Sequence, residues 1–181
     1  YDDLGKILDW DAVKKFRRSA LNPDHPVIRG TAQNPDIYFQ ERESVNRYYD
    51  ALPELVEEAM AQIAKITGRE HHLFDYYGAK DADRVIIAMG SVCQTAEEVV
   101  DYLNKNGEKV GLLNVHLYRP FSVEHFLKQL PTTVKKVAVL DRTKEPGAMG
   151  EPLYQDVVTA LANAGMNDVK VIGGRYGLGS K

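Results

Sequence analysis

The sequence predicts an α/β fold with a doubly wound, mostly parallel sheet, preceded by a helical and extended N-terminal appendage. From residue 69 onward, short and almost continuously apolar stretches alternate with amphipathic ones. Buried parallel strands read as continuous apolar runs, and helices covering both faces of a sheet read as amphipathic segments. The predicted strands span residues 84–90, 109–117, 135–141 and 169–174, and the predicted helices span 95–106, 122–130 and 151–164. A short strand at 72–76 is compatible with its sequence.

The first 68 residues carry a different pattern. Asp9 is a plausible N-cap, and Trp10, Val13 and Phe16 follow it at helical spacing. Residues 22–42 contain three prolines and a glycine, which predicts an extended segment. Residues 43–68 show a helical repeat in which Pro53 predicts a kink or a restart. We therefore divide the chain into 1–68, an interdomain appendage ending in a long helix, and 69–181, an α/β body ending in a linker.

Composition excludes several function classes. The formal net charge is −3 and the isoelectric point is about 6.0, which leaves no broad basic surface for nucleic acid. No stretch approaches the ~18 apolar residues of a membrane span. The single cysteine, Cys93, excludes an internal disulfide and the usual four-thiolate ligand set of an iron–sulfur cluster. These features fit a cytoplasmic protein that binds neither nucleic acid nor membranes.

Gly90 and Ser91 lie between a predicted strand and a predicted helix, where free backbone N–H groups can hold a phosphate or a carboxylate. They are the weak anion-site candidates of the sequence. A structural role is favoured, because Ser91 and Gln94 match a capping box and Gly90 permits a tight turn. A small-anion or nucleotide-binding regulatory module is the alternative function.

Four further side chains invite a chemical interpretation. Cys93 is expected in the first helical turn, where the helix dipole lowers a thiol pKa, and His116 could act as its base if their strands are neighbours. No motif supports that pair, so a buried, inert cysteine is favoured. His71 and His72 are adjacent in sequence and point apart, which is poor geometry for one metal ion. We therefore assign no metal-binding residue.

The loop "DRTKEPGAMG" at 141–150 follows a buried strand and precedes Glu151-Pro152, a favourable helix start. Loops at this edge of a doubly wound sheet commonly carry function. Its charges of both signs suit a protein interface better than an anion pocket. The interface candidates at this end of the chain are Asp141, Arg142, Lys144, Glu145 and Glu151.

Several long stretches together resemble one enzyme family. They are "HPVIRGTAQNPDIYFQERE", "VIIAMGSVCQTAEEVVDYL", "GLLNVHLYRPF", "VLDRTKEPGAMGEPLYQDV" and "GGRYGLGSK". In this order they are similar to the second domain of pyruvate:ferredoxin (flavodoxin) oxidoreductase, with relatives acting on other 2-oxo acids ranked second. The resemblance implies a fold like the C-terminal domain of transketolase.

The family enzyme is expected to decarboxylate pyruvate on thiamine diphosphate and Mg²⁺, to pass electrons through [4Fe-4S] clusters to ferredoxin or flavodoxin, and to form acetyl-CoA. It is expected to be a homodimer. We expect no catalytic residue and no cofactor in this chain, which would be inactive alone and would position other domains of the same polypeptide. The resemblance also implies that 22–42 crosses from a preceding domain, which adds Arg29, Thr31 and Asn34 to the interface candidates.

Overall fold

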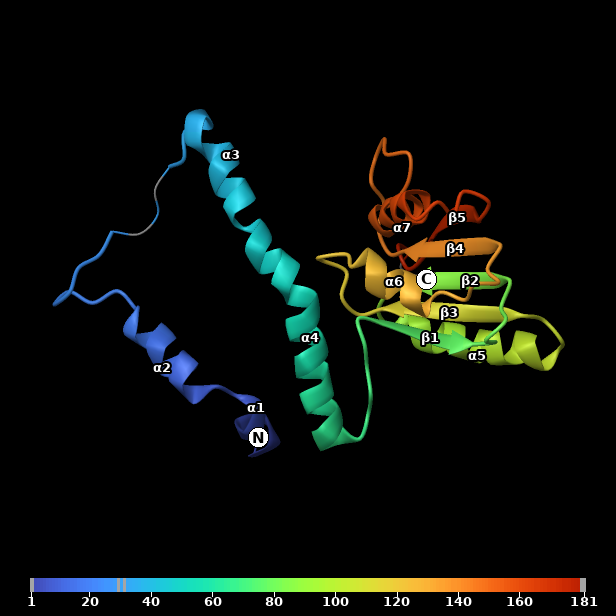
Figure 1. The fold of residues 1–181 in the computed structure, drawn as a ribbon, viewed down its shortest axis with the longest axis horizontal. Helices are drawn as coiled ribbons and strands as arrows, with labels where there is room; N and C mark the ends of the chain where they lie inside the picture. The colour runs from blue at the N-terminus through green and yellow to red at the C-terminus, as the bar shows by residue number, and fades with distance from the viewer. Residues whose placement is uncertain (1, 29, 31, 180–181) are drawn as a thin grey trace. The chain divides into compact units, whose positions relative to one another are not determined.

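A computed structural model describes residues 2–28, 30 and 32–179. The chain forms two compact units, Tyr1–Glu70 and His71–Lys181, which are drawn in Figure 1. Among the residues that the structure describes, no helix is both long and apolar enough to cross a membrane.

The first unit is built of helices α1 (Asp2–Ile7), α2 (Trp10–Arg18), α3 (Pro35–Ser44) and α4 (Asn46–Thr67). Asp9 caps α2 as predicted, because its side chain accepts hydrogen bonds from the N–H groups of Asp11 and Ala12 at 3.0 and 2.9 Å. None of the described residues of this unit is buried. Apolar side chains such as Phe16, which is 79% exposed, are therefore left uncovered by the unit itself.

Two predictions for the first unit were wrong. The segment 22–42 was expected to be extended, yet α3 begins at Pro35. Proline is well suited to the first helical position, where its missing N–H costs nothing, and the preceding Asn34 has extended backbone angles. Pro53 was predicted to kink or restart the helix, and the restart is absent, because α4 runs through this residue without interruption. The helix ends at Gly68, whose φ of 70° is the left-handed conformation favoured by glycine at this position.

The second unit contains a five-stranded sheet of order β1-β3-β2-β4-β5. Its strands are β1 (Phe74–Gly78), β2 (Arg84–Ala88), β3 (Val110–Val115), β4 (Lys136–Asp141) and β5 (Lys170–Arg175). The edge strand β1 runs antiparallel to β3, and the other three pairings are parallel. The mostly parallel sheet predicted from the alternation is thereby confirmed.

Helices cover both faces of this sheet. Helix α5 (Val92–Lys105) buries Cys93, Ala96 and Val100 against the face that carries Ala88 and Leu112. Helices α6 (Val123–Gln129) and α7 (Pro152–Asn163) lie on the opposite face. There the ring of Phe126 packs on that of Phe74 at 5.7 Å between centroids. The fold is therefore doubly wound.

Candidate functional site at the carboxyl edge of the sheet

The carboxyl ends of β2 and β4 form the topological switch point of the fold. These strands are neighbours, but the chain leaves β2 toward β3 on one side and leaves β4 toward β5 on the other. Doubly wound proteins bind their ligands in the crevice at such a point. Residues 89–91 and 142–150 form the loops that flank it, so the two loops singled out from the sequence lie at the same edge.

The C-terminal segment crosses this edge of the sheet. The hydroxyl of Tyr176 donates a hydrogen bond to the carbonyl of Met89 at 3.1 Å, and its N–H donates to the carbonyl of Asp141 at 3.1 Å. Gly177 lies against Arg142, since a Cβ on this glycine would be 3.0 Å from the Arg142 Nε. The residues predicted to be a linker thus bind to the loops beside β2 and β4 at least as far as Gly177.

Asp141 is buried, with 2% of its surface exposed, and it caps helix α7 from the end of β4. Its two carboxylate oxygens accept hydrogen bonds from the N–H groups of Leu153 at 3.0 Å and Tyr154 at 3.1 Å. Pro152 has no N–H, and the next N–H, of Gln155, bonds to the carbonyl of Glu151 at 3.0 Å. All four positions of the first turn are satisfied, so the Asp141 side chain serves the interior of the unit.

Glu151 is also buried and holds the loop to the sheet. One carboxylate oxygen accepts the N–H of Glu145 at 2.7 Å, and the other forms an ion pair with Arg175 on β5. The hydrogen bond from Arg175 holds the pKa of Glu151 below its ordinary value, despite the opposing effect of burial. Asp141 and Glu151 therefore stabilise the loop instead of presenting their charges to a partner.

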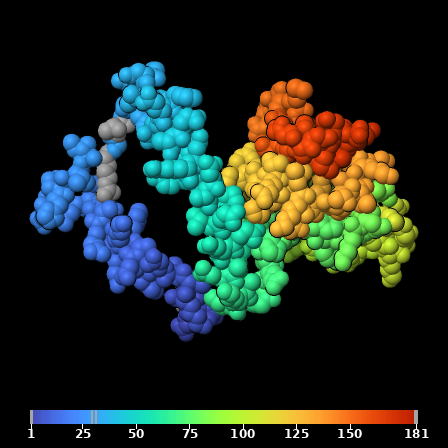
Figure 2. Space-filling view, in the orientation of Figure 1, coloured from blue at the N-terminus to red at the C-terminus, as the bar shows by residue number. Residues whose placement is uncertain are grey.

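The outer part of the same loop presents its side chains to solvent. Arg142, Lys144 and Glu145 are exposed, and Met149 is fully exposed. The backbone turns at Gly147, whose φ is 78°, and the N–H of Ala148 bonds to the carbonyl of Glu145. This outer loop, residues 142–149, projects from the unit and is orange in Figure 2.

The anion-site candidates Gly90 and Ser91 have a local structural role. Gly90 has a φ of 80°, so it provides the tight turn between β2 and α5. The predicted capping box is wrong, because Ser91 is the N-cap residue of α5 but its side chain makes no capping hydrogen bond. Anion binding here stays a prediction.

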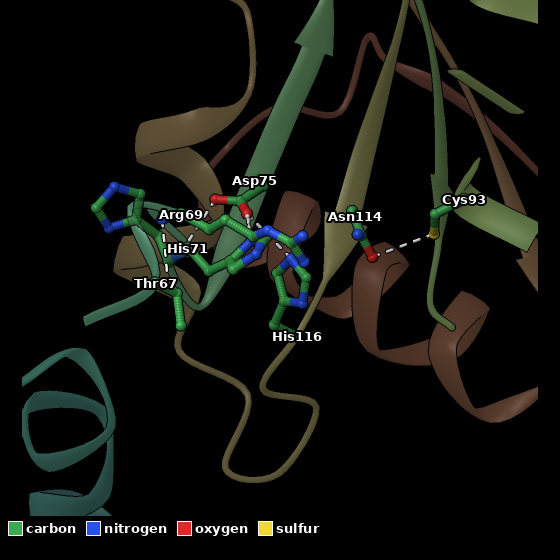
Figure 3. A network of polar contacts seen from close by, with 8 residues as sticks. Thr67, Arg69, His71, Asp75, Cys93, Asn114 and His116 are labelled. Carbon is green, nitrogen blue, oxygen red and sulfur yellow. Dashed lines mark hydrogen bonds and ion pairs between the residues drawn. The ribbon is translucent and has the colours of Figure 1, made fainter. Parts of the chain in front are cut away.

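Cys93 and His116 do not form a catalytic pair. Their strands are neighbours, as the pair would require, but the thiol donates to the Asn114 Oδ1 at 3.1 Å and the His116 Nε2 contacts the Asp75 carboxylate at 3.0 Å (Figure 3). Burial, together with the nearby charge of Glu97, raises the pKa of the thiol to about 11. Burial disfavours the charged thiolate, and Cys93 is the buried cysteine that was favoured from the sequence.

Sequence reasoning missed a cluster at the β1–β3 side of the same edge. His71, Asp75 and His116 offer one ligand atom each within 4.8 Å of one another. The Asp75 Oδ2 lies 3.1 Å from the His71 Nδ1 and 3.0 Å from the His116 Nε2. His72, the other histidine considered, contributes its backbone N–H, which donates to the Asp75 Oδ1 at 3.1 Å. The cluster could not be predicted from the sequence, because it depends on the antiparallel pairing of β1 with β3.

The remaining interface candidates lie in the first unit. Arg29 and Thr31 are outside the described residues. Asn34 is the residue before α3, and its side chain makes no capping hydrogen bond.

The second unit is a doubly wound α/β domain. This class is defined by the order of its strands, by the helices on both faces of the sheet and by the loops at the switch point. The sequence model described as "Pyruvate:ferredoxin oxidoreductase core domain II" matches residues 82–179, which is 98 of the 181 residues. The chain belongs to this family.

Curated relatives agree with this assignment. The chain is 65% identical to pyruvate-flavodoxin oxidoreductase of Enterobacter agglomerans and 64% identical to pyruvate:ferredoxin oxidoreductase of Moorella thermoacetica, over its whole length in both comparisons. It spans only 15% of the length of each relative. A solved 2-oxoglutarate:ferredoxin oxidoreductase from Magnetococcus marinus matches 80% of this chain and 21% of its own, with 19% identity and a TM-score of 0.41.

Proposed function

We propose that this chain is an internal domain of a pyruvate:ferredoxin or pyruvate:flavodoxin oxidoreductase. The reaction of such an enzyme is the oxidative decarboxylation of pyruvate to acetyl-CoA and CO2, with reduction of ferredoxin or flavodoxin. The observation that carries the proposal is the identity of 64–65% along the entire chain to two relatives with these names. Because the chain spans 15% of their length, the chemistry belongs largely to other parts of the polypeptide.

The residues of this chain do not fit the cofactors that the family implies. A [4Fe-4S] cluster takes four thiolates, and the chain has one cysteine, which is buried and protonated at neutral pH. The sequence also has no Gly-Asp-Gly motif of the kind that holds thiamine diphosphate and Mg²⁺. We assign these groups and coenzyme A to neighbouring domains and derive no reaction step through them.

The role that we propose for the second unit is to position neighbouring domains through its outer loop, residues 142–149. A surface that positions another domain has to be held rigidly by its own unit and has to expose side chains to the partner. Asp141 and Glu151 fix the two ends of the loop from inside the unit, whereas Arg142, Lys144 and Met149 are exposed. A misplacement of reacting groups by ~1 Å can cost about 100-fold in rate, so such a surface can matter without touching substrate.

For the first unit we propose a role as a tether to a preceding domain. Its described residues include no buried side chain, although α2 and α4 carry apolar residues on one side. Exposed apolar stretches of this kind are typical of surfaces that meet another protein surface. Asn34, together with Arg29 and Thr31, belongs to this proposed contact. A cytoplasmic location and a homodimeric assembly complete the proposal.

The test uses the intact enzyme and a loop variant that combines Arg142→Ala, Lys144→Ala and Met149→Ser. We expect pyruvate-dependent reduction of flavodoxin to fall roughly 10- to 100-fold, or the assembled size to change in gel filtration. The matched control is Lys105→Ala, an exposed lysine at the end of α5 and hence at the opposite edge of the sheet. Normal rate and size in the loop variant would overturn the positioning role. An intact protein without pyruvate-dependent reduction would overturn the activity itself.

A further inference from the structure

The cluster of His71, Asp75 and His116 is built by the register of two strands. Phe74 on β1 lies opposite Val115 on β3, so Asp75 and His116 are diagonal neighbours on one face of the antiparallel pair. The N–H of His116 donates to the carbonyl of the buried Leu73 at 3.0 Å, which fixes the backbone beyond the end of β3. His71 approaches from the segment that leads into β1. Three separate pieces of backbone thus converge on one point.

The spacing of the three ligand atoms is that of a metal coordination shell. Zinc bonds of about 2.0–2.1 Å place neighbouring ligand atoms of a tetrahedral site about 3.3–3.4 Å apart. The Asp75 Oδ2 lies 3.1 Å from one imidazole nitrogen and 3.0 Å from the other, and all three atoms are within 4.8 Å. Of the three distances, only the one between the His71 Nδ1 and the His116 Nε2 has to shorten. The His71 side chain is 51% exposed, so it has room to move.

The Asp75 carboxylate, the central ligand of the three, is oriented by a backbone hydrogen bond. The His72 N–H occupies Oδ1 and leaves Oδ2 directed at the two imidazoles. Hydrogen bonds that orient a ligand from behind are a regular feature of metal sites. Figure 3 shows both rings facing this carboxylate, with Cys93 apart from them.

We propose that His71, Asp75 and His116 bind a divalent transition-metal ion, with Zn²⁺ as the ion that two imidazoles and one carboxylate suit best. When the ion binds, the hydrogen bonds between the Asp75 Oδ2 and the two imidazoles are lost. The His71 Nδ1, the Asp75 Oδ2 and the His116 Nε2 then coordinate the ion. Water completes the shell, since the three side chains are between 27% and 51% exposed. The site clamps the segment before β1 to the far end of β3.

The test is a calorimetric titration of the full chain, free of any histidine tag, with Zn²⁺. We expect one ion per chain and a dissociation constant that is weakened about 100-fold or more by His71→Ala, His116→Ala or Asp75→Asn, since even outer-shell changes cost 10- to 100-fold. The matched control is His25→Ala, which removes an exposed histidine of the first unit. It is expected to bind as the unchanged protein does.

Two readouts distinguish this site from adventitious Zn²⁺ binding elsewhere on the chain. A hundredfold excess of Zn²⁺ over the dissociation constant is expected to raise the Tm by roughly 10 °C in the unchanged protein and in His25→Ala, but not in the three ligand variants. Titration with Co²⁺ is expected to give visible d–d bands without a sulfur-to-metal charge-transfer band. Zn²⁺ binding that is equal in the His71→Ala and unchanged proteins would overturn the proposal, as would no binding at all or a charge-transfer band from Cys93.

Discussion

Removal of the Asp141 carboxylate is expected to destabilise the second unit strongly, although the sequence shows Asp141 only as the first residue of a charged stretch, 141–150. The carboxylate is 2% exposed and is the acceptor for the N–H groups of Leu153 and Tyr154. In Asp141→Ala both donors lose their acceptor at a buried helix start. The helix has no local substitute, because the side chain of Glu151, its own N-cap residue, makes no capping bond.

The magnitude follows from these two hydrogen bonds. A buried donor left without an acceptor costs about 1–3 kcal/mol, and the loss of a helix cap costs about 0.5–2 kcal/mol overall. We therefore expect Asp141→Ala to lower the free energy of unfolding by about 3 kcal/mol, or roughly 12 °C in Tm for a unit of this size. Asp141→Asn keeps one acceptor oxygen and should lose about half as much.

Urea denaturation followed by far-ultraviolet circular dichroism measures the free energy of unfolding, with Asp168→Ala as the control. Asp168 is an exposed aspartate of the same unit, and its removal should change stability by less than about 0.5 kcal/mol. Amide hydrogen exchange gives a local readout, since the N–H groups of Leu153 and Tyr154 should exchange faster in Asp141→Ala. A loss below about 1 kcal/mol with unchanged exchange would refute the capping role.

Two further predictions concern the core and the turns of the second unit. Because the thiol of Cys93 has a pKa of about 11 against an ordinary value of 9.0, its thiolate fraction at pH 8 is about 100-fold lower than that of a free thiol. Iodoacetamide should label Cys93 at least 100-fold more slowly than it does in urea, by mass spectrometry, and comparable rates would contradict the assignment of a buried, protonated thiol. Gly78→Ala should cost about 3–5 kcal/mol, since φ is 119° and a Cβ would lie 2.7 Å from the Val110 carbonyl oxygen. Gly147→Ala, with φ of 78° and open space around it, should cost only about 1–2 kcal/mol, and equal losses would show that the close approach at Gly78 is unimportant.

Much of the second unit could be predicted because its central strands β2, β3 and β4 are largely buried. Residues 85–89 and 137–140 are apolar in every position, and the helical repeats between such runs leave few alternatives to a parallel sheet. The same alternation placed the loops after β2 and β4 at one edge, which the strand order confirms. Local chemistry was predictable where it depended on adjacent residues, as for Asp9 and the helix that it caps.

Local signals were misleading where one residue type serves two structural roles. The three prolines of residues 22–42 indicate an extended segment, but proline also begins helices, and α3 starts at Pro35. Ser91 and Gln94 match a capping box, yet the Ser91 side chain makes no capping hydrogen bond. In each case the outcome depends on the backbone conformation of a single residue. The type of that residue favours one conformation but does not determine it.

The sequence by itself determined the α/β class, the carboxyl-edge loops and the family, because each rests on patterns or similarities that extend along many residues. Only the tertiary structure decided which charges are internal and which are accessible. Asp141 and Glu151 were indistinguishable from Arg142 as charged loop residues, but their hydrogen-bond partners lie in α7, the loop backbone and β5. The cluster of His71, Asp75 and His116 joins residues up to 45 positions apart in sequence. It exists because β1 pairs antiparallel with β3, a long-range choice that depends on the packing of the whole sheet.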